Sequence, residues 1–422
     1  MPNRRTVLSA IASGLTAAVI KPTSAFAAPP RPAKKTYLYA NVGPQLMQFE
    51  VDAEAMTLVQ VGAIQLPDSV QYVWPHQSRR YLYVATSNTQ PGNGAKAGNS
   101  HHLVALKIDR TGGLSLHGAP LPLPSRPIHV STDIPSANAL VAFSKPSALR
   151  VYAINEDGTL KGEVAQRSPV DAGIYAHQAR VAPSNDLAIL VTRGNEATPD
   201  HAEEPGALKV FRYAGGQVSD EYSVARDQGR GFGPRHVDFH PTRPWVYLSI
   251  ETQNQVCLLR LNEGRVEPSF LFAQTTLDPN QEHRARQAAG PIHVHPNGRF
   301  LYCANRAEQT ENVQGVAVFK GGENSIAVYA IDPQTGQPML KQHIDTHGVH
   351  PRTFHIDPSG QMLVVEHNLP VVVRNGNSLE TTPAGLSVFR VDADGTLAFI
   401  RKYDFDVGNQ SMFWCGIVAS WY

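Results

Sequence analysis

The 422-residue chain has little charge and almost no cysteine. Its 37 basic and 36 acidic residues make up only 17% of the chain and leave a formal net charge of +1. This balance lacks the basic footprint of proteins that bind nucleic acid or anionic membranes. The cysteines are odd in number and form no CxxC pair, so we expect no disulfide framework; they are Cys257, Cys303 and Cys415. A small polar molecule is the expected partner.

Long apolar segments are also missing, apart from a run near the N-terminus. That run ends at Ile20, and its length of about 14 residues is too short to span a bilayer of about 30 Å. It follows Arg4-Arg5 and precedes Ala25-x-Ala27, a pattern typical of a twin-arginine export signal with a peptidase site. We predict an export signal over 1–27, a linker over 28–35, and a periplasmic or secreted protein with no integral membrane anchor. The export machinery would be a transient partner.

What the sequence does contain is a sevenfold repeat of two consecutive strand-like segments. The first segment is apolar and often begins with paired aromatic residues, as in Tyr37–Asn41 and Phe300–Arg306. The second segments end 46 to 70 residues apart, near Phe49, Leu106, Tyr152, Phe211, Leu259, Tyr329 and Phe389. This spacing is too wide for a solenoid and suits four-stranded blades. The sequence therefore predicts an all-β, seven-bladed β-propeller that forms one domain over 36–422.

Ring closure can be predicted from the two chain ends. Proline marks a tight turn before six of the seven first segments, at Pro75, Pro135, Pro183, Pro241, Pro296 and Pro358. The first unit thus lacks an innermost strand, and Met412–Val418 is the one unassigned strand-like segment. Pairing it with Tyr37–Asn41 would close the propeller with strands from both chain ends and remove free sheet edges. Long insertions are predicted as polar loops; they are Thr89–Ser100, Asn195–Pro205, Asp278–Ala289 and Ala307–Glu323.

Polar residues occupy equivalent positions at the ends of the predicted inner strands. The innermost strand of a blade runs along the channel and the next one runs back, so the start of one and the end of the other share a face. His177, Arg235 and Arg352 precede innermost strands, whereas Glu251 and Arg306 end the strands that follow. These five side chains are expected to converge on one channel mouth. Arginines can hold a carboxylate or phosphate there through paired hydrogen bonds.

Three stretches resemble a known family. They are Gly233–Pro241, Gly298–Arg306 with Ser325–Tyr329, and His350–Phe354. Together with the repeat pattern from about Tyr37 to Tyr403, they are similar to the seven-bladed lactonase propellers. This family includes 6-phosphogluconolactonase and carboxy-cis,cis-muconate lactonizing enzyme. The resemblance implies catalytic roles for His177, Arg235, Glu251 and Arg306.

The chain departs from the family pattern at two places. Thr192-Arg193-Gly194 stands where an Asp-Leu-Gly segment is common, which adds Arg193 near the mouth. The insertion Ala307–Asn324 separates the Asn-Arg of the sixth blade from the Ser-Ile that usually follows closely. We expect Arg193 and Arg352 to bind substrate, and the identity of the lactone stays open.

The leading hypothesis is an exported, metal-independent lactonase acting on a sugar-derived or carboxylated lactone. Arginines would hold the substrate anion and stabilise the oxyanion, while Glu251 or His177 accepts the proton of the attacking water. The sequence does not distinguish these two bases. One alternative is a lactonizing enzyme or cycloisomerase of the carboxymuconate type. Another is a non-catalytic ligand-binding propeller, in which Glu251 and His177 would not face a common pocket.

Neither a metal nor an organic cofactor is expected. Calcium, which some other lactonases use, needs several converging oxygen ligands, whereas the mouth positions carry mainly arginine. Gly229–Gly233 is rich in glycine, but no helix pattern follows it, so it is not a dinucleotide-binding fingerprint.

Overall fold

The computed structural model describes residues 35–89, 97–282 and 286–421. The described residues belong to one compact unit within 34–422. The predicted export signal over 1–27, and the predicted linker except for its last residue, lie outside the described residues. Within the described ranges no helix has the length and apolar character needed to cross a bilayer. The helical element there is a single 3₁₀ turn, η1 (Asp227–Gly229).

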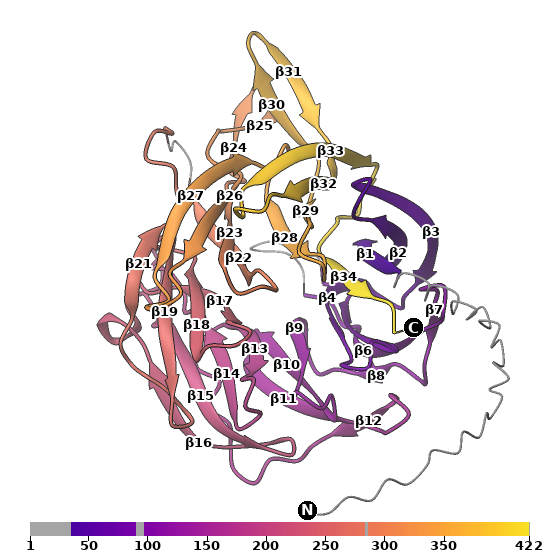
Figure 1. The fold of residues 1–422 in the computed structure, drawn as a ribbon, viewed down its shortest axis with the longest axis vertical. Coiled ribbons are helices and arrows are strands. Elements are labelled where there is room, and N and C mark those ends of the chain that lie inside the picture. The colour runs from indigo at the N-terminus through magenta and orange to yellow at the C-terminus, as the bar shows by residue number, and fades with distance from the viewer. Residues whose placement is uncertain (1–34, 90–96, 283–285, 422) are drawn as a thin grey trace, which may run out of the picture. The chain divides into compact units, whose positions relative to one another are not determined.

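Within the described part of unit 34–422, seven antiparallel sheets are arranged in a ring around a common axis (Figure 1). The predicted seven-bladed propeller is confirmed, and we number its blades 1 to 7 in chain order. The innermost strands are β34 (Cys415–Ala419), β4 (Ser69–Pro75), β9 (Pro127–Thr132), β13 (Ala176–Val181), β17 (Pro234–Phe239), β22 (Ala288–Val294) and β28 (Pro351–Ile356). The second strands are β1 (Thr36–Val42), β5 (Tyr81–Ser87), β10 (Asn138–Ser144), β14 (Leu187–Thr192), β18 (Trp245–Ile250), β23 (Phe300–Arg306) and β29 (Met362–His367).

Two further layers of strands complete the blades. The third strands are β2 (Gln45–Asp52), β6 (His101–Ile108), β11 (Ser147–Ile154), β15 (Ala207–Ala214), β19 (Gln255–Asn262), β26 (Ser325–Ile331) and β32 (Ala384–Val391). The outer strands are β3 (Thr57–Gln65), β7 (Leu114–Leu116) with β8 (Leu121–Pro122), β12 (Leu160–Glu163), β16 (Gln217–Val224), β20 (Arg265–Val266) with β21 (Leu271–Thr275), β27 (Pro338–Asp345) and β33 (Leu397–Phe405). The middle strands are almost fully buried, because each blade face packs on a neighbour.

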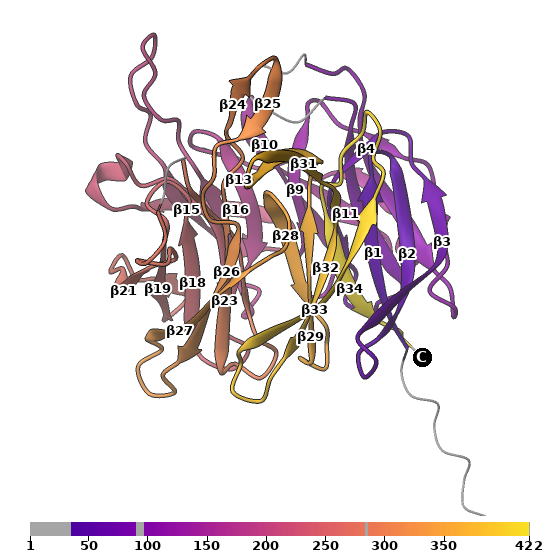
Figure 2. The same ribbon diagram turned by 90° about the horizontal axis from the view of Figure 1, so that it is seen from above.

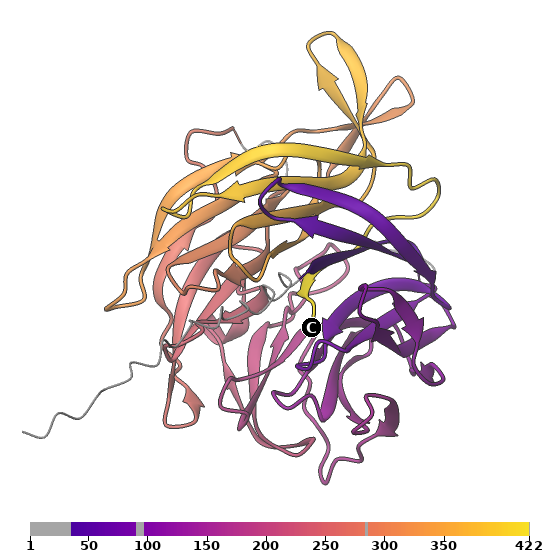
Figure 3. The ribbon, with the colours of Figure 1, turned by 45° about the vertical axis from the view of Figure 1, so that its right-hand side comes forward.

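The ring is closed by strands from both chain ends, as predicted. β34 pairs antiparallel with β1, with Tyr37 opposite Val418 and Ala40 opposite Cys415. Figure 3 shows this yellow C-terminal strand against the indigo strands of blade 1. The regular strand begins at Cys415 rather than at the predicted Met412. The backbone amides of the two preceding residues instead donate hydrogen bonds to Oδ1 of Asn41.

Neighbouring blades are tied together by a repeated contact between an aromatic pair and a turn glycine. A tyrosine of the second strand donates its hydroxyl hydrogen bond to the glycine carbonyl of the next blade at 2.8 to 3.0 Å. These pairs are Tyr39–Gly112, Tyr83–Gly158, Tyr247–Gly336 and Tyr302–Gly395. Two residues before each tyrosine, another aromatic ring covers the same glycine. The paired aromatics of the sequence repeat are therefore contacts between blades.

Glycine is required at these turns for two physical reasons. Gly395 has φ +87°, a conformation that side chains with a Cβ rarely adopt. An added Cβ would also lie 2.3 Å from the ring of Phe300. A substitution at this position would thus strain the backbone and displace the ring.

One insertion was wrongly predicted to be only a loop. Residues 307–323 contain the hairpin β24 (Thr310–Val313) and β25 (Val316–Phe319), and a later insertion forms the hairpin β30 (Val371–Asn375) and β31 (Ser378–Thr382). The hairpins join through β25 and β30 into one four-stranded sheet. Figure 2 shows the hairpin of β24 and β25 at one end of the ring, with β31 close by. This sheet depends on pairing across more than 50 residues, which local sequence patterns do not reveal.

Candidate active site at the channel mouth

The innermost strands carry an irregularity that aims side chains at one channel mouth. In six blades of the described chain, the pairing between the first and second strands shifts by one residue near this end. The residues passed over are Gln71, Ile128, His177, Arg235 and Arg352, with Gly290-Pro291 in blade 6. A β-bulge of this kind re-aims the extra side chain. Three of these positions, His177, Arg235 and Arg352, are predictable from the sequence, but the bulge that creates them is not.

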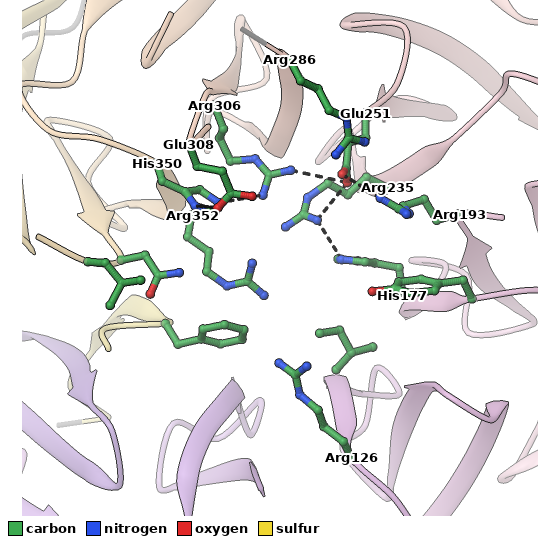
Figure 4. Close-up of a pocket in the computed structure, with 15 residues that line it drawn as sticks. Arg126, His177, Arg193, Arg235, Glu251, Arg286, Arg306, Glu308, His350 and Arg352 are labelled. Atoms are coloured by element: carbon green, nitrogen blue, oxygen red, sulfur yellow. Dashed lines mark hydrogen bonds and ion pairs between the residues drawn. The ribbon is translucent and has the colours of Figure 1, made fainter. Parts of the chain in front are cut away.

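Four of the bulged residues border a cavity of about 220 Å³, shown in Figure 4; they are Ile128, His177, Arg235 and Arg352. All six site residues named from the sequence line it: His177, Arg193, Arg235, Glu251, Arg306 and Arg352. Within the described residues, six arginines and two glutamates face this cavity; the additional members are Arg126, Arg286 and Glu308. Glu251 and His177 thus share one pocket, contrary to the expectation of the non-catalytic alternative.

Glu251 is the centre of an ion-paired cluster of arginines. Its Oε2 lies 3.1 Å from Nη1 of Arg235 and 3.4 Å from Nη2 of Arg306, and its Oε1 lies 3.1 Å from Nη1 of Arg193. Burial alone would raise the pKa of Glu251, but the surrounding arginines, Arg235 first, hold it well below its ordinary value. The carboxylate is therefore charged at any ordinary pH and has little tendency to accept a proton.

His177 is neutral and already engaged. Its Nε2 lies 2.8 Å from Nη1 of Arg235, which can only donate, so Nε2 is the acceptor and the proton sits on Nδ1. Burial, followed by the charge of Arg235, holds the pKa of His177 well below its usual range. Within the described chain, Nδ1 is buried without a hydrogen-bond partner.

The remaining arginines are held in the cavity at an electrostatic cost. Burial, with the nearby charge of Arg235, lowers the pKa of Arg306 to about 10 and lowers that of Arg352 as well. The guanidinium carbon of Arg352 lies 3.5 Å from the ring centre of Phe413, a cation–π contact contributed by the C-terminal segment. Nε of Arg235 and Nε of Arg306 are buried without a partner in the described residues.

Sequence reasoning missed three residues that lie next to the bulges. Arg126, Tyr175 and His350 each stand two positions before a bulged residue, and all three line the cavity. Tyr175 and His350 have φ +57°, whereas Gly233 with φ +49° occupies the equivalent place in blade 5. Counting back two residues from each bulged residue would have identified these three positions. Its left-handed backbone could not have been expected for a tyrosine or a histidine.

Glu308 was missed for a different reason. It belongs to the insertion after β23, and its carboxylate Oε2 lies 2.6 Å from Nδ1 of His350. Figure 4 shows Glu308 beside His350 and Arg306. Nothing in the local sequence places this insertion at the mouth. Within the described residues, no group of three or more His, Cys, Asp or Glu side chains is arranged to hold a metal ion.

Comparisons with known proteins agree with this architecture. Residues 36–382 match the profile of the family described as "Lactonase, 7-bladed beta-propeller". The chain is 26% identical over 330 residues to 6-phosphogluconolactonase of Bacillus subtilis, covering 76% of this chain and 84% of that protein. It is 25% identical over 382 residues to 6-phosphogluconolactonase of Serratia proteamaculans, covering 89% and 97%.

The solved structures agree in fold. The periplasmic gluconolactonase of Pseudomonas aeruginosa superposes with a TM-score of 0.68 at 20% identity, covering 92% of this chain and 99% of that one. Its similarity concerns the fold alone. Because the family profile spans most of the propeller and the seven blades are present, the chain belongs to the seven-bladed β-propeller lactonase family.

Proposed function

We propose that this chain is an exported, metal-independent lactonase that hydrolyses an anionic lactone, sugar-derived or carboxylated, at the channel mouth. The observation that carries the proposal is the charge of the cavity, where six guanidinium groups face only two carboxylates within the described residues. Such an excess favours a ligand that brings its own negative charge. The named activity of the Bacillus and Serratia relatives supports ring-opening hydrolysis as the reaction class.

Arginine can serve the reaction in two ways. Arg352 and Arg126 hold the anionic group of the substrate against Phe413, where both side chains already contact the ring. The guanidinium groups of Arg235 and Arg306 line the cavity and stabilise the oxyanion formed when water attacks the ring carbonyl. Arg193, bound to Glu251, completes the cluster from blade 4.

Glu251 and His177 organise these arginines. Glu251 is paired with three of them, and its depressed pKa makes it a weak proton acceptor, so we assign it the role of fixing their geometry. His177 fixes the orientation of Arg235 through Nε2. Both residues stay part of the catalytic centre, because an arginine displaced by about 1 Å can cost roughly 10²-fold in rate.

The test is a lactone hydrolysis assay on the purified protein. A panel of phosphorylated, carboxylated and neutral aldonolactones should show turnover of the anionic members, and EDTA should leave the rate unchanged. Arg235→Lys keeps the charge and loses the planar fork, so KM should rise about 10- to 100-fold. Absence of hydrolysis across the panel would refute the proposed reaction. An EDTA-sensitive rate would refute metal independence.

Export needs its own experiment. Replacing Arg4 and Arg5 by lysine should keep the full-length protein inside the cell, whereas the natural sequence should yield mature protein beginning at Ala28. Fractionation and N-terminal sequencing measure both. Unchanged export of the lysine variant would exclude the twin-arginine route.

A further inference from the structure

His350 and Glu308 form a second, separate pair of titratable groups in the cavity. Nδ1 of His350 lies 2.6 Å from Oε2 of Glu308, and its Nε2 lies 3.4 Å from Nη1 of Arg306. The hydrogen bond with His350 lowers the pKa of Glu308 to about 2, so Glu308 is the acceptor and Nδ1 carries the proton. The unprotonated Nε2 therefore faces the arginines of the mouth.

The two histidines of the mouth, His177 and His350, differ in how closely an arginine approaches the unprotonated Nε2. Arg235 approaches Nε2 of His177 to 2.8 Å, whereas Arg306 stays 3.4 Å from Nε2 of His350. His350 also lines a second hollow of about 230 Å³ beside the main cavity, together with Glu251, Arg306 and Glu308. A water molecule in liquid occupies roughly 30 Å³, so there is room for water next to the ring.

The backbone around His350 is fixed from several sides. Oδ1 of Asn324 accepts hydrogen bonds from the backbone N–H of His350 at 2.9 Å and from that of Ala307 at 3.0 Å. One side chain thus holds the histidine and the segment that bears Glu308 at a constant separation. His350 also adopts φ +57°, a conformation that costs energy for a residue with a side chain. Strain of this kind persists only where the surroundings enforce it.

The electrostatic surroundings keep His350 neutral. Burial lowers its pKa, Glu308 acts in the opposite direction, and the charges of Arg306 and Arg352 lower it further. Behind it, burial lowers the pKa of His367 to about 3, so that ring adds no charge at working pH. A neutral imidazole with a carboxylate on one nitrogen and only a long, 3.4 Å contact from Arg306 on the other is suited to take a proton from water.

We propose that His350 is the general base of the lactonase reaction and that Glu308, supplied by the insertion after β23, is its positioning residue. The inference rests on the proposed function. Water attacks the ring carbonyl as its O–H proton passes to Nε2 of His350, and a new C–O bond forms. The ring C–O bond then breaks, and the leaving ring oxygen takes that proton from the imidazolium. The sum is lactone plus water giving the open hydroxy acid.

Four variants test the assignment, each compared with the natural protein on the best anionic lactone. His350→Gln should lower kcat by roughly 10²–10⁴-fold with little change in KM. Glu308→Gln should lower kcat by roughly 10- to 100-fold. Two controls lie close by and face elsewhere: Glu311, which pairs with Arg374, and His347, which stacks on Phe399. Glu311→Gln and His347→Gln should keep kcat.

The pH dependence of activity shows whether Glu308 positions His350 for catalysis or only supports the fold. Activity should fall on the acid side as His350 becomes protonated. Because Glu308 raises the pKa of His350, Glu308→Gln should move this acid limb to lower pH, whereas loss of folded protein would leave its position unchanged. A circular dichroism melt of each variant establishes that it is folded.

The outcomes distinguish failure of the proposed lactonase function from failure of the assignment of His350 as the base. An inactive natural protein overturns the proposed function, and the assignment of His350 falls with it. An active natural protein whose His350→Gln variant keeps kcat overturns only the assignment. The same follows if His177→Gln abolishes turnover while His350→Gln does not, or if the acid limb of Glu308→Gln stays in place.

Discussion

The channel mouth and the interfaces between blades use polar groups in opposite ways. At four interfaces, the hydroxyl of the second-strand tyrosine meets a glycine carbonyl of the next blade, and that glycine is covered by a ring. At the mouth, guanidinium groups crowd together, and buried nitrogens of Arg235, Arg306 and His177 have no partner in the described residues. The four tyrosine–glycine hydrogen bonds are complete without a ligand, whereas these nitrogens of the mouth have no partner in the part of the chain that the structure describes.

This difference indicates that the interfaces between blades contribute mainly to stability and the channel mouth mainly to function. Buried charges that lack full compensation destabilise a fold, and such groups concentrate where a ligand will compensate them. Substitutions at the mouth should therefore change activity more than stability, and substitutions at the interfaces should do the reverse. The four predictions below test this contrast, from the largest effect to the smallest.

Glu251→Gln should give the largest change. Losing the carboxylate leaves Arg193, Arg235 and Arg306 to repel one another, so kcat/KM should fall by roughly 10²–10³-fold. Steady-state kinetics measure this fall, and Glu267→Gln, at the half-buried position after the outer strand β20 of the same blade, is the matched control. If both variants keep the natural rate, the mouth is not the catalytic centre.

Gly395→Ala should produce the largest loss of stability. Backbone strain at φ +87° and a clash with Phe300 together should cost about 2–4 kcal/mol of unfolding free energy. The fraction of the variant that is folded should have the kcat of the natural protein. Gly376→Ala is the control, because Gly376 also has a positive φ but no atom lies within 4 Å of an added Cβ. Equal losses in denaturant melts of the two variants would show that ring coverage contributes nothing.

Arg352→Met should change substrate binding and stability in different directions within a single variant. The substitution removes a buried cation whose pKa is depressed and keeps most of the side-chain volume, so unfolding free energy should stay equal or rise by about 1 kcal/mol. Because the variant lacks the guanidinium group that binds the anionic part of the substrate, KM should rise by about tenfold or more. Melting curves and kinetics on one preparation give both values, and a destabilised variant with unchanged KM would contradict the contrast.

Tyr302→Phe should have the smallest effect. It keeps the ring and removes the 2.9 Å hydrogen bond to the Gly395 carbonyl, which should cost about 1–2 kcal/mol. The same denaturant melts detect it, with kcat as the control. A loss as large as that of Gly395→Ala would mean that the hydroxyl, rather than turn geometry, dominates the tie.

The sequence predicted the repeat and the closure well because both depend on local patterns. Paired aromatics, prolines at turns and one unassigned segment, Met412–Val418, were sufficient for seven blades and for the pairing of β34 with β1. The mouth was predicted in part. Arg235 and Glu251 occupy strand ends that can be recognised, whereas Glu308 reaches the cavity only through an insertion that folds beside another one.

The last strand of the chain has a consequence for the timing of synthesis. Chains fold from the N-terminus as they leave the ribosome, yet blade 1 must wait for Cys415–Ala419, which is made after all the other strands of the propeller. Phe413, on which Arg352 stacks, is made just before that strand. A chain interrupted before Phe413 therefore has neither a closed ring nor a finished cavity.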